Sequence, residues 1–294
     1  MYPRLIILLL LVLPCNGRGQ IILDTMYFNQ NWEQSTKQDA NYYRIVSTDT
    51  SSGSFRFFVR DFYLSGQVQM TGTYKSIRPD NKDGQFIYYY ENGQQQRDCH
   101  YRENTLNGIF REWYRSGQQK NEQEYKNGLL DGIYKTWREN GSLKMEARYV
   151  RGKKNGNFKT YYENGQHIRN DLYEADRLVE GFCFTPDGDP TEYFPYMVMP
   201  QFQDGQTGLR KFIERELKYP PEAKRKGYQG YVIVVFTVDE EGNVKDPQIV
   251  NGDREYFNEE ALRVVNLFPK WIPGKVDGIP SPVHVTVPIE FLLR

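Results

Sequence analysis

The segment DGIYKTWRENG, residues 131–141, carries a pattern that the chain repeats. Its opening pair, an acidic or amide residue followed by glycine, recurs as Asp83-Gly84, Asn107-Gly108, Asp131-Gly132, Asn155-Gly156 and Glu180-Gly181. Its closing pair recurs in phase as Asn92-Gly93, Ser116-Gly117, Asn140-Gly141, Asn164-Gly165 and Asp187-Gly188. The first four glycines of each series stand 24 residues apart. A fixed period of this size is typical of a stacked-repeat architecture.

Aromatic residues keep the same period. Three series recur once per repeat: Phe86, Phe110, Tyr134 and Phe158; Tyr89, Trp113, Trp137 and Tyr161; Tyr101, Tyr125, Tyr149 and Tyr173. Aromatic side chains suit a pleated sheet, and Asn-Gly supplies the positive φ that a tight hairpin turn needs. Each repeat is therefore predicted to be a β-hairpin that must stack on its neighbours to be stable.

The repeat that opens at Asp83-Gly84 illustrates the predicted hairpin. Its first strand is expected over Gln85 to Glu91, its turn at Asn92-Gly93, and its second strand over Gln95 to Tyr101. A polar turn ending at Gly108 is expected to lead into the next hairpin. Because paired strands lie about 4.8 Å apart, the meander should advance by about 10 Å per repeat.

The pattern Asp-Gly-x-Tyr-x-x-Trp-x-x-Asn-Gly, seen from Asp131 to Gly141, resembles the MORN-type repeat. It is most similar to the bacterial YwqK-type ("antitoxin") variant. The resemblance covers roughly residues 62 to 190 and is specific because it recurs. It implies a sheet-forming repeat domain, which we expect over residues 20–190.

The first 19 residues have the form of a secretory signal peptide. A short positive start precedes the unbroken apolar run Leu5 to Leu13, which Pro14 ends. Nine apolar residues reach only about 14 Å as a helix, which is short of a ~30 Å hydrocarbon core. We therefore expect a cleaved signal at residues 1–19 and a periplasmic or envelope protein. A lipoprotein attached through Cys15 is the less favoured alternative, since a proline precedes that cysteine.

Two cysteines remain after cleavage, Cys99 and Cys183. They lie about three and a half repeats apart, which corresponds to about 35 Å in a straight stack. A disulfide requires Cα atoms within about 7 Å. Both are expected to be free, buried, structural thiols.

The pattern changes after the repeats. Prolines 186, 190, 195 and 200 predict a linker, placed at residues 191–207. Residues 208–294 predict an α-β-β-α-β unit, with helices at Gly208 to Lys218 and after Asn258, the latter as its N-cap. Strands are expected over Gly230 to Val238, Val244 to Val250 and Val283 to Phe291. The predicted fold is thus a mainly β repeat meander followed by a small α+β domain.

This unit resembles the C-terminal domain of TonB, with a lead-in similar to Bacteroidetes-type relatives. The motifs that carry the resemblance are Tyr219-Pro220, Ala223, Gly227, Gln229-Gly230-Tyr231-Val232, Asp239 to Val244, Glu260-Ala261, Pro269-x-Trp271-x-Pro273-Gly274 and Val287-Pro288-Ile289. The match covers about 95 residues, and the order of its motifs makes it specific.

The resemblance implies a function in binding. In the family this domain meets outer-membrane TonB-dependent receptors by accepting a short receptor segment as an added β-strand, in support of transmembrane transport. It implies partner-binding residues at Tyr219, Pro220, Val283, Val285, Val287 and Ile289. Trp271 and Tyr231 are expected in the core, and Pro288 removes one backbone donor from the last strand. The energy-transducing part of the family's function transfers less well, because no long apolar anchor is evident.

Other functions have little support. Lysine plus arginine equals aspartate plus glutamate at 38 each, which gives no reason to expect nucleic acid. The three histidines are scattered, and no zinc spacing, nucleophile elbow or phosphate loop occurs, so we predict no enzyme, metal or cofactor. The alternative function is a repeat-based scaffold that binds a protein, glycan or lipid. An exposed row of aromatic side chains would favour that alternative, and packed rows would favour receptor binding.

Overall fold

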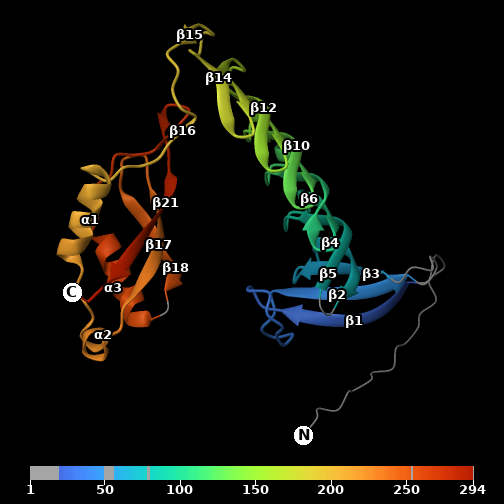
Figure 1. Ribbon diagram of the computed structural model, residues 1–294. Helices are drawn as coiled ribbons and strands as arrows, with labels where there is room; N and C mark the ends of the chain where they lie inside the picture. The colour runs from blue at the N-terminus through green and yellow to red at the C-terminus, as the bar shows by residue number, and fades with distance from the viewer. Residues whose placement is uncertain (1–19, 50–55, 78–79, 253, 294) are drawn as a thin grey trace. The chain divides into compact units, whose positions relative to one another are not determined.

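We describe the fold from a computed structural model, over residues 20–49, 56–77, 80–252 and 254–293 (Figure 1). The predicted signal peptide and Cys15 lie outside these residues. The chain forms two compact units. The first ends at Gly181 and includes Pro186–Gly188, whereas the second takes in Phe182–Thr185 and continues from Asp189 to the C-terminus.

The first unit is a continuous antiparallel meander in which each strand pairs with the next along the chain, except that the two-residue β7 and the following β8 both pair with β6. The predicted repeat sheet is confirmed. Its strands are β1 (Gln20–Phe28), β2 (Tyr42–Asp49), β3 (Phe57–Tyr63), β4 (Val68–Ile77), β5 (Asp80–Tyr89), β6 (Gln95–Arg102), β7 (Thr105–Leu106), β8 (Gly108–Trp113), β9 (Gln119–Lys126), β10 (Leu129–Trp137), β11 (Leu143–Val150), β12 (Lys153–Tyr161), β13 (His167–Glu174), β14 (Arg177–Phe184) and β15 (Pro190–Thr191).

The turn at Asn92-Gly93 is confirmed and is one residue longer than a two-residue hairpin loop. The backbone N–H of Tyr90 donates to the Gln94 carbonyl at 2.8 Å, and that of Gly93 donates to the Tyr90 carbonyl at 2.9 Å. Gly93 alone among the loop residues has a positive φ, 85°. This geometry matches a three-residue hairpin loop that closes with a left-handed glycine.

The prediction of a turn that ends at Gly108, which would be the second turn of the repeat, was wrong. The chain reverses at Glu103-Asn104, where φ is 50° and 63°, so both residues are left-handed as a type I′ turn requires. Gly108 lies beyond this turn at the start of β8. Register shifts mark the corresponding position of β10, between Leu130 and Tyr134. The Asn-Gly and Asp-Gly pairs that open the repeats therefore form β-bulges, in which a glycine with positive φ is also favoured.

The repeating aromatic residues pack across paired strands. Phe86, fully buried, meets Tyr101 edge-on with ring centroids 5.2 Å apart. Equivalent pairs occur within the other repeats at 6.0 to 6.1 Å: Phe110 with Tyr125 and Phe158 with Tyr173, both edge-on, and Tyr134 with Tyr149, whose rings are tilted. Edge-to-face contacts of this kind stabilise beyond the area that they bury. Cys99 and Cys183 are both buried and free, as expected.

The second unit is an α+β domain, which confirms the predicted fold class. It contains α1 (Gly205–Glu216), α2 (Pro221–Lys226), β17 (Gly230–Val238), β18 (Val244–Gly252), α3 (Glu255–Asn266) and β21 (Val283–Phe291). The sheet has the order β18-β17-β21, and α1 and α3 lie against one of its faces (Figure 1). The core joins Leu209 of α1, Val264 of α3 and Phe236 of β17.

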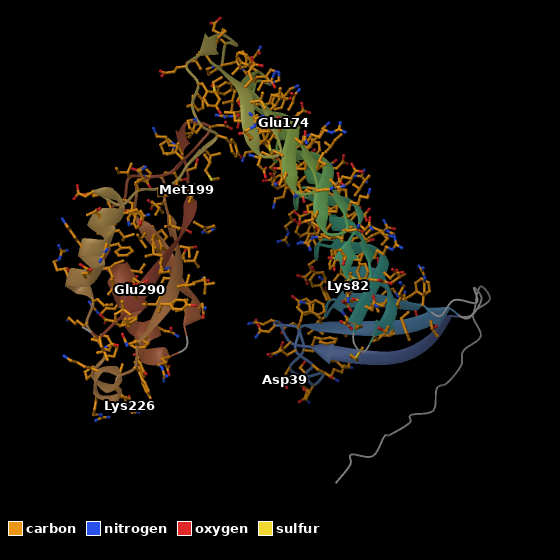
Figure 2. The ribbon with its side chains drawn as sticks, in the orientation of Figure 1. Asp39, Lys82, Glu174, Met199, Lys226 and Glu290 are labelled. Atoms are coloured by element: carbon orange, nitrogen blue, oxygen red, sulfur yellow. The ribbon has the colours of Figure 1, made fainter. Side chains whose placement is uncertain are left out.

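Part of the segment expected as a linker is folded into this second unit. β16 (Met197–Val198) pairs with β19 (Lys275–Val276), which pairs in turn with β20 (Ile279–Pro280). Phe202 packs against Trp271 with ring centroids 5.3 Å apart. Met199, labelled in Figure 2, lies in the chain between Val198 and Phe202, the residues that make these two contacts. Apolar side chains therefore fix this segment although prolines flank it.

Helix α3 begins earlier than the sequence predicted. Its N-cap is Arg254, and Asn258 lies inside the helix, so the prediction of Asn258 as the cap was wrong. The added turn carries Phe257, which is buried and stacks on Phe291 with ring centroids 4.2 Å apart. Packing of this aromatic residue outweighs the preference of asparagine for a helix terminus.

Candidate strand-addition site

The four expected contact residues of β21 point into the domain. Val283, Val287 and Ile289 are buried, and Val285 is half-buried. Val285, Val287 and Ile289 pack with β17 and the helices in the core. A partner that reaches β21 would therefore meet their backbone edge and not their side chains.

Tyr219 and Pro220 also hold the fold. The Tyr219 hydroxyl donates to the Tyr228 carbonyl, and its ring stands edge-on to Phe257 and Phe291 at 6.1 Å from each. Burial raises the pKa of this hydroxyl, so it remains a donor at neutral pH. Pro220 is buried as the N-cap of α2. Their side chains anchor the start of α2 against the end of β21.

The edge of β21 follows from its register. β21 pairs with β17 through nine successive residue pairs without a shift, and Pro288 stands opposite Ile233. A proline nitrogen carries no hydrogen, so this pair must be of the non-hydrogen-bonded kind. Because the two kinds alternate along an antiparallel ladder, His284, Thr286 and Glu290 belong to the same kind.

These residues direct their backbone groups away from β17. The N–H and C=O of His284, Thr286 and Glu290 point to the far edge of β21, and Pro288 offers only its C=O. Among the described strands, β21 has no partner on that side. The second unit thus presents an open β-edge with three donors and four acceptors over seven residues.

The side chains beside this edge are those of the exposed residues of β21, which alternate with the buried ones. The prediction from sequence did not include them. His284, Thr286, Pro288 and Glu290 are exposed and lie on the sheet face opposite the helices (Glu290 is labelled in Figure 2). Tyr231, which pairs with Glu290, is 53% exposed on that same face, so its expected place in the core was wrong. Strict alternation within β21 was the signal that could have identified them.

The opposite edge of the sheet is irregular. β18 shifts register twice against β17, once between Ile233 and Val234 and once between Val235 and Thr237. Asp246 has a φ of 48°, and Pro247 follows it within the strand. A bulged edge with a proline is poorly suited to receive another strand. The site for strand addition is therefore better placed on β21.

The repeats present no comparable aromatic surface. All twelve repeating aromatic residues named above are buried or half-buried, and none is exposed. One row of outward positions carries charges that alternate in sign from strand to strand, such as Arg111 and Glu122, which meet at 2.6 Å. Exposed aliphatic side chains, such as those of Ile109 and Ile133, lie on the same strands. The exposed aromatic row that would favour the scaffold alternative is therefore not found among these twelve residues.

Across the described residues, metal-binding clusters and membrane-spanning helices are both absent. No group of three or more His, Cys, Asp and Glu side chains in this part of the chain could hold a metal ion. None of the helices described here has the length and apolar character needed to span a bilayer.

Comparison with known proteins supports both units. The family model of the Gram-negative bacterial TonB protein C-terminal matches residues 215–293. The MORN repeat variant matches four segments, residues 82–103, 106–127, 130–151 and 154–174. The chain therefore carries a TonB-type C-terminal domain preceded by MORN-variant repeats.

Individual relatives match the same C-terminal region. Protein TonB of Helicobacter pylori strain J99 is 30% identical over 91 residues, which cover 29% of this chain and 30% of that protein. Protein TonB of Xanthomonas campestris pv. campestris strain B100 is 34% identical over 77 residues, 26% of this chain and 34% of that protein. The NMR solution structure of the Helicobacter pylori TonB-CTD shares 28% identity, covering 29% of this chain and 78% of that chain, with a TM-score of 0.24. The match thus spans about a third of the length of these curated relatives.

Proposed function

We propose that this chain is an envelope protein whose C-terminal domain binds an outer-membrane protein by adding an extended segment of that protein to the edge of β21. The observation that carries the proposal is the regular, open ladder from His284 to Glu290, set against the bulged edge of β18. The partner we favour is a TonB-dependent receptor, with another envelope protein as the alternative. We place the protein in the periplasm after removal of residues 1–19.

Backbone hydrogen bonds supply the affinity of an added strand, and neighbouring side chains supply its specificity. On β21 the backbone N–H and C=O groups that face the open edge belong to the exposed residues of the strand. The adjacent side chains are those of His284, Thr286 and Glu290. The predicted role of Val283, Val285, Val287 and Ile289 becomes indirect in this proposal. They hold the strand in the register that turns the other residues toward the partner.

The repeats serve in this proposal as a spacer and a second contact surface. Each repeat is tied to the next by bonds at both ends of its strands. The Tyr90 hydroxyl donates to the Trp113 carbonyl at 2.8 Å, and the Tyr114 hydroxyl donates to the Trp137 carbonyl at 2.9 Å. Bonds that recur from repeat to repeat stiffen the stack along its length, as a spacer requires.

A capture experiment tests the proposal. The full chain is immobilised and exposed to solubilised outer-membrane proteins, beside the variants Thr286→Pro and Thr286→Ala. Thr286→Pro removes the N–H that faces the open edge while leaving the bonds to β17 intact, and Thr286→Ala removes only the side chain. We expect capture of a receptor by the wild type and by Thr286→Ala, with loss in Thr286→Pro. Equal capture by all three chains would rule out strand addition at β21.

A further inference from the structure

We propose that Pro288 is the specificity-determining residue of the β21 edge, and that it prevents this edge from pairing with the same edge of a second copy of the chain. The part that concerns the receptor rests on the proposed function above. The part that concerns self-pairing does not, because it follows from the backbone alone.

Pro288 interrupts the open edge and leaves the strand otherwise intact. The register of β21 against β17 runs without a shift through Pro288, so the lost donor affects only the side away from β17. The edge is thereby divided. On one side of Pro288, His284 and Thr286 each offer a backbone donor and a backbone acceptor, and on its other side Glu290 does the same.

Apart from this proline, the β21 edge is well suited to pair with itself. Two copies arranged antiparallel about Val287 would place His284 opposite Glu290 and Thr286 opposite Pro288. The Thr286–Pro288 pair occurs twice in such a dimer, on either side of its centre, and each occurrence lacks one of its two hydrogen bonds. The two missing bonds therefore flank the middle of the interface, where they weaken it most.

Prolines mark both edges of this sheet and are absent from strands β1 to β14 of the repeat sheet. Residues 80–185 contain no proline, whereas the outer strands β18 and β21 carry Pro247 and Pro288. Proline within an edge strand is a common defence against edge-to-edge association. Pro247 adds to a bulge that already blocks pairing, but Pro288 lies in a regular strand and has no such reinforcement. The defence of β21 therefore depends on Pro288.

Sedimentation equilibrium of the full chain tests the inference. Pro288→Thr restores the donor with a residue that favours strands, and we expect its dimer dissociation constant to fall by about tenfold or more, since two hydrogen bonds are regained. Pro247→Thr is the matched control and should sediment as the wild type does, because the bulge remains. Adding Thr286→Pro to Pro288→Thr moves the missing donor from residue 288 to residue 286, so each 286–288 pair again lacks one hydrogen bond and the wild-type behaviour should return.

Two outcomes separate this inference from the proposed function. If Pro288→Thr keeps a wild-type circular dichroism spectrum and does not self-associate more strongly, the inference is wrong, even if the chain captures a receptor. If Pro288→Thr self-associates but the wild type captures no outer-membrane protein, the inference stands and the proposed function fails. Where a receptor is captured, Pro288→Thr should bind it more tightly, by a few-fold for the one added bond.

Discussion

Asn104 binds the backbone of Lys82, which lies in the preceding hairpin. The side-chain oxygen Oδ1 of Asn104 accepts from the Lys82 N–H at 2.7 Å, and the Asn104 N–H donates to the Lys82 carbonyl at 2.9 Å. Lys82, labelled in Figure 2, also places its Nζ 5.0 Å from the centre of the Tyr101 ring. Asp176 holds Lys154 in the same way, with Oδ1 accepting from its N–H at 2.8 Å. Hydrogen bonds from the type I′ turns therefore hold successive repeats together.

Replacing Asn104 should show how much these hydrogen bonds contribute to the free energy of unfolding. Asn104→Ala loses two side-chain bonds, the one accepted from the Lys82 N–H and the one that Asn104 Nδ2 donates to the Asp80 carbonyl at 2.9 Å. Alanine also tolerates a φ of 63° less well than asparagine, so the free energy of unfolding should fall by about 1–3 kcal/mol. Asn104→Asp should cost less, because Asp176 performs the same role in a later repeat. Urea unfolding of the two variants measures the difference. Equal losses would show that the side-chain acceptor does not hold the turn.

Phe86 should be a main source of stability in the repeat sheet. It is fully buried and contacts both Tyr74 and Tyr101 edge-on. Phe86→Ala is expected to lower the free energy of unfolding by about 3–5 kcal/mol. Phe182→Ala is the matched control, since Phe182 is 50% exposed and should contribute far less. A similar loss in both variants would contradict the assignment of Phe86 to the core.

The two cysteines should be unreactive until the chain unfolds. Burial raises the pKa of the Cys99 thiol to about 11, so it is protonated at neutral pH and its nucleophilic thiolate is scarce. We expect a thiol reagent added to a chain beginning at residue 20 to label neither Cys99 nor Cys183 in buffer, and to label both in urea. Failure to label in urea without a reductant would reveal a disulfide, contrary to the free thiols described above.

Asp239 should contribute to stability in a pH-dependent way. The side-chain amide of Asn243 donates to its carboxylate at 2.8 Å, and this bond, with further bonds from the Asn243 and Glu241 backbone, lowers the pKa of Asp239. A lowered pKa means that the contribution is complete above the usual value of about 4 and is lost as the pH falls through the lower folded value. Wild type should therefore be more stable than Asp239→Asn at pH 7, and the gap should close in acid. A constant gap from pH 7 to pH 2 would refute this role.

The sequence could predict the repeat sheet because its spacing and its turn chemistry are both periodic. It could not separate turns from bulges, since Asn-Gly favours positive φ in either setting, and so Gly108 was assigned to a turn. The contribution of Met197 and Val198 was missed because two-residue strands leave no periodic pattern. Their position depends on pairing with Lys275 and Val276, far along the chain.

The candidate site shows a further limit of sequence patterns. Alternation in β21 separates two sets of residues but does not state which set meets a partner. The apolar set, from Val283 to Ile289, was chosen, and the structure turns it toward the helices. Tyr231 was expected in the core, but β17 is apolar on both faces and the helices cover only one of them. Which face is covered depends on the packing of α1 and α3, and this information is not local to either strand.

Amide hydrogen exchange tests the central claim most directly. The backbone amides of His284, Thr286 and Glu290 face the open edge and should exchange quickly in the free chain, whereas those of Val285, Val287 and Ile289 bond to β17 and should already be protected. Addition of the captured outer-membrane protein should slow exchange at His284, Thr286 and Glu290. Binding that leaves these three amides exchanging as fast as before would contradict strand addition at β21.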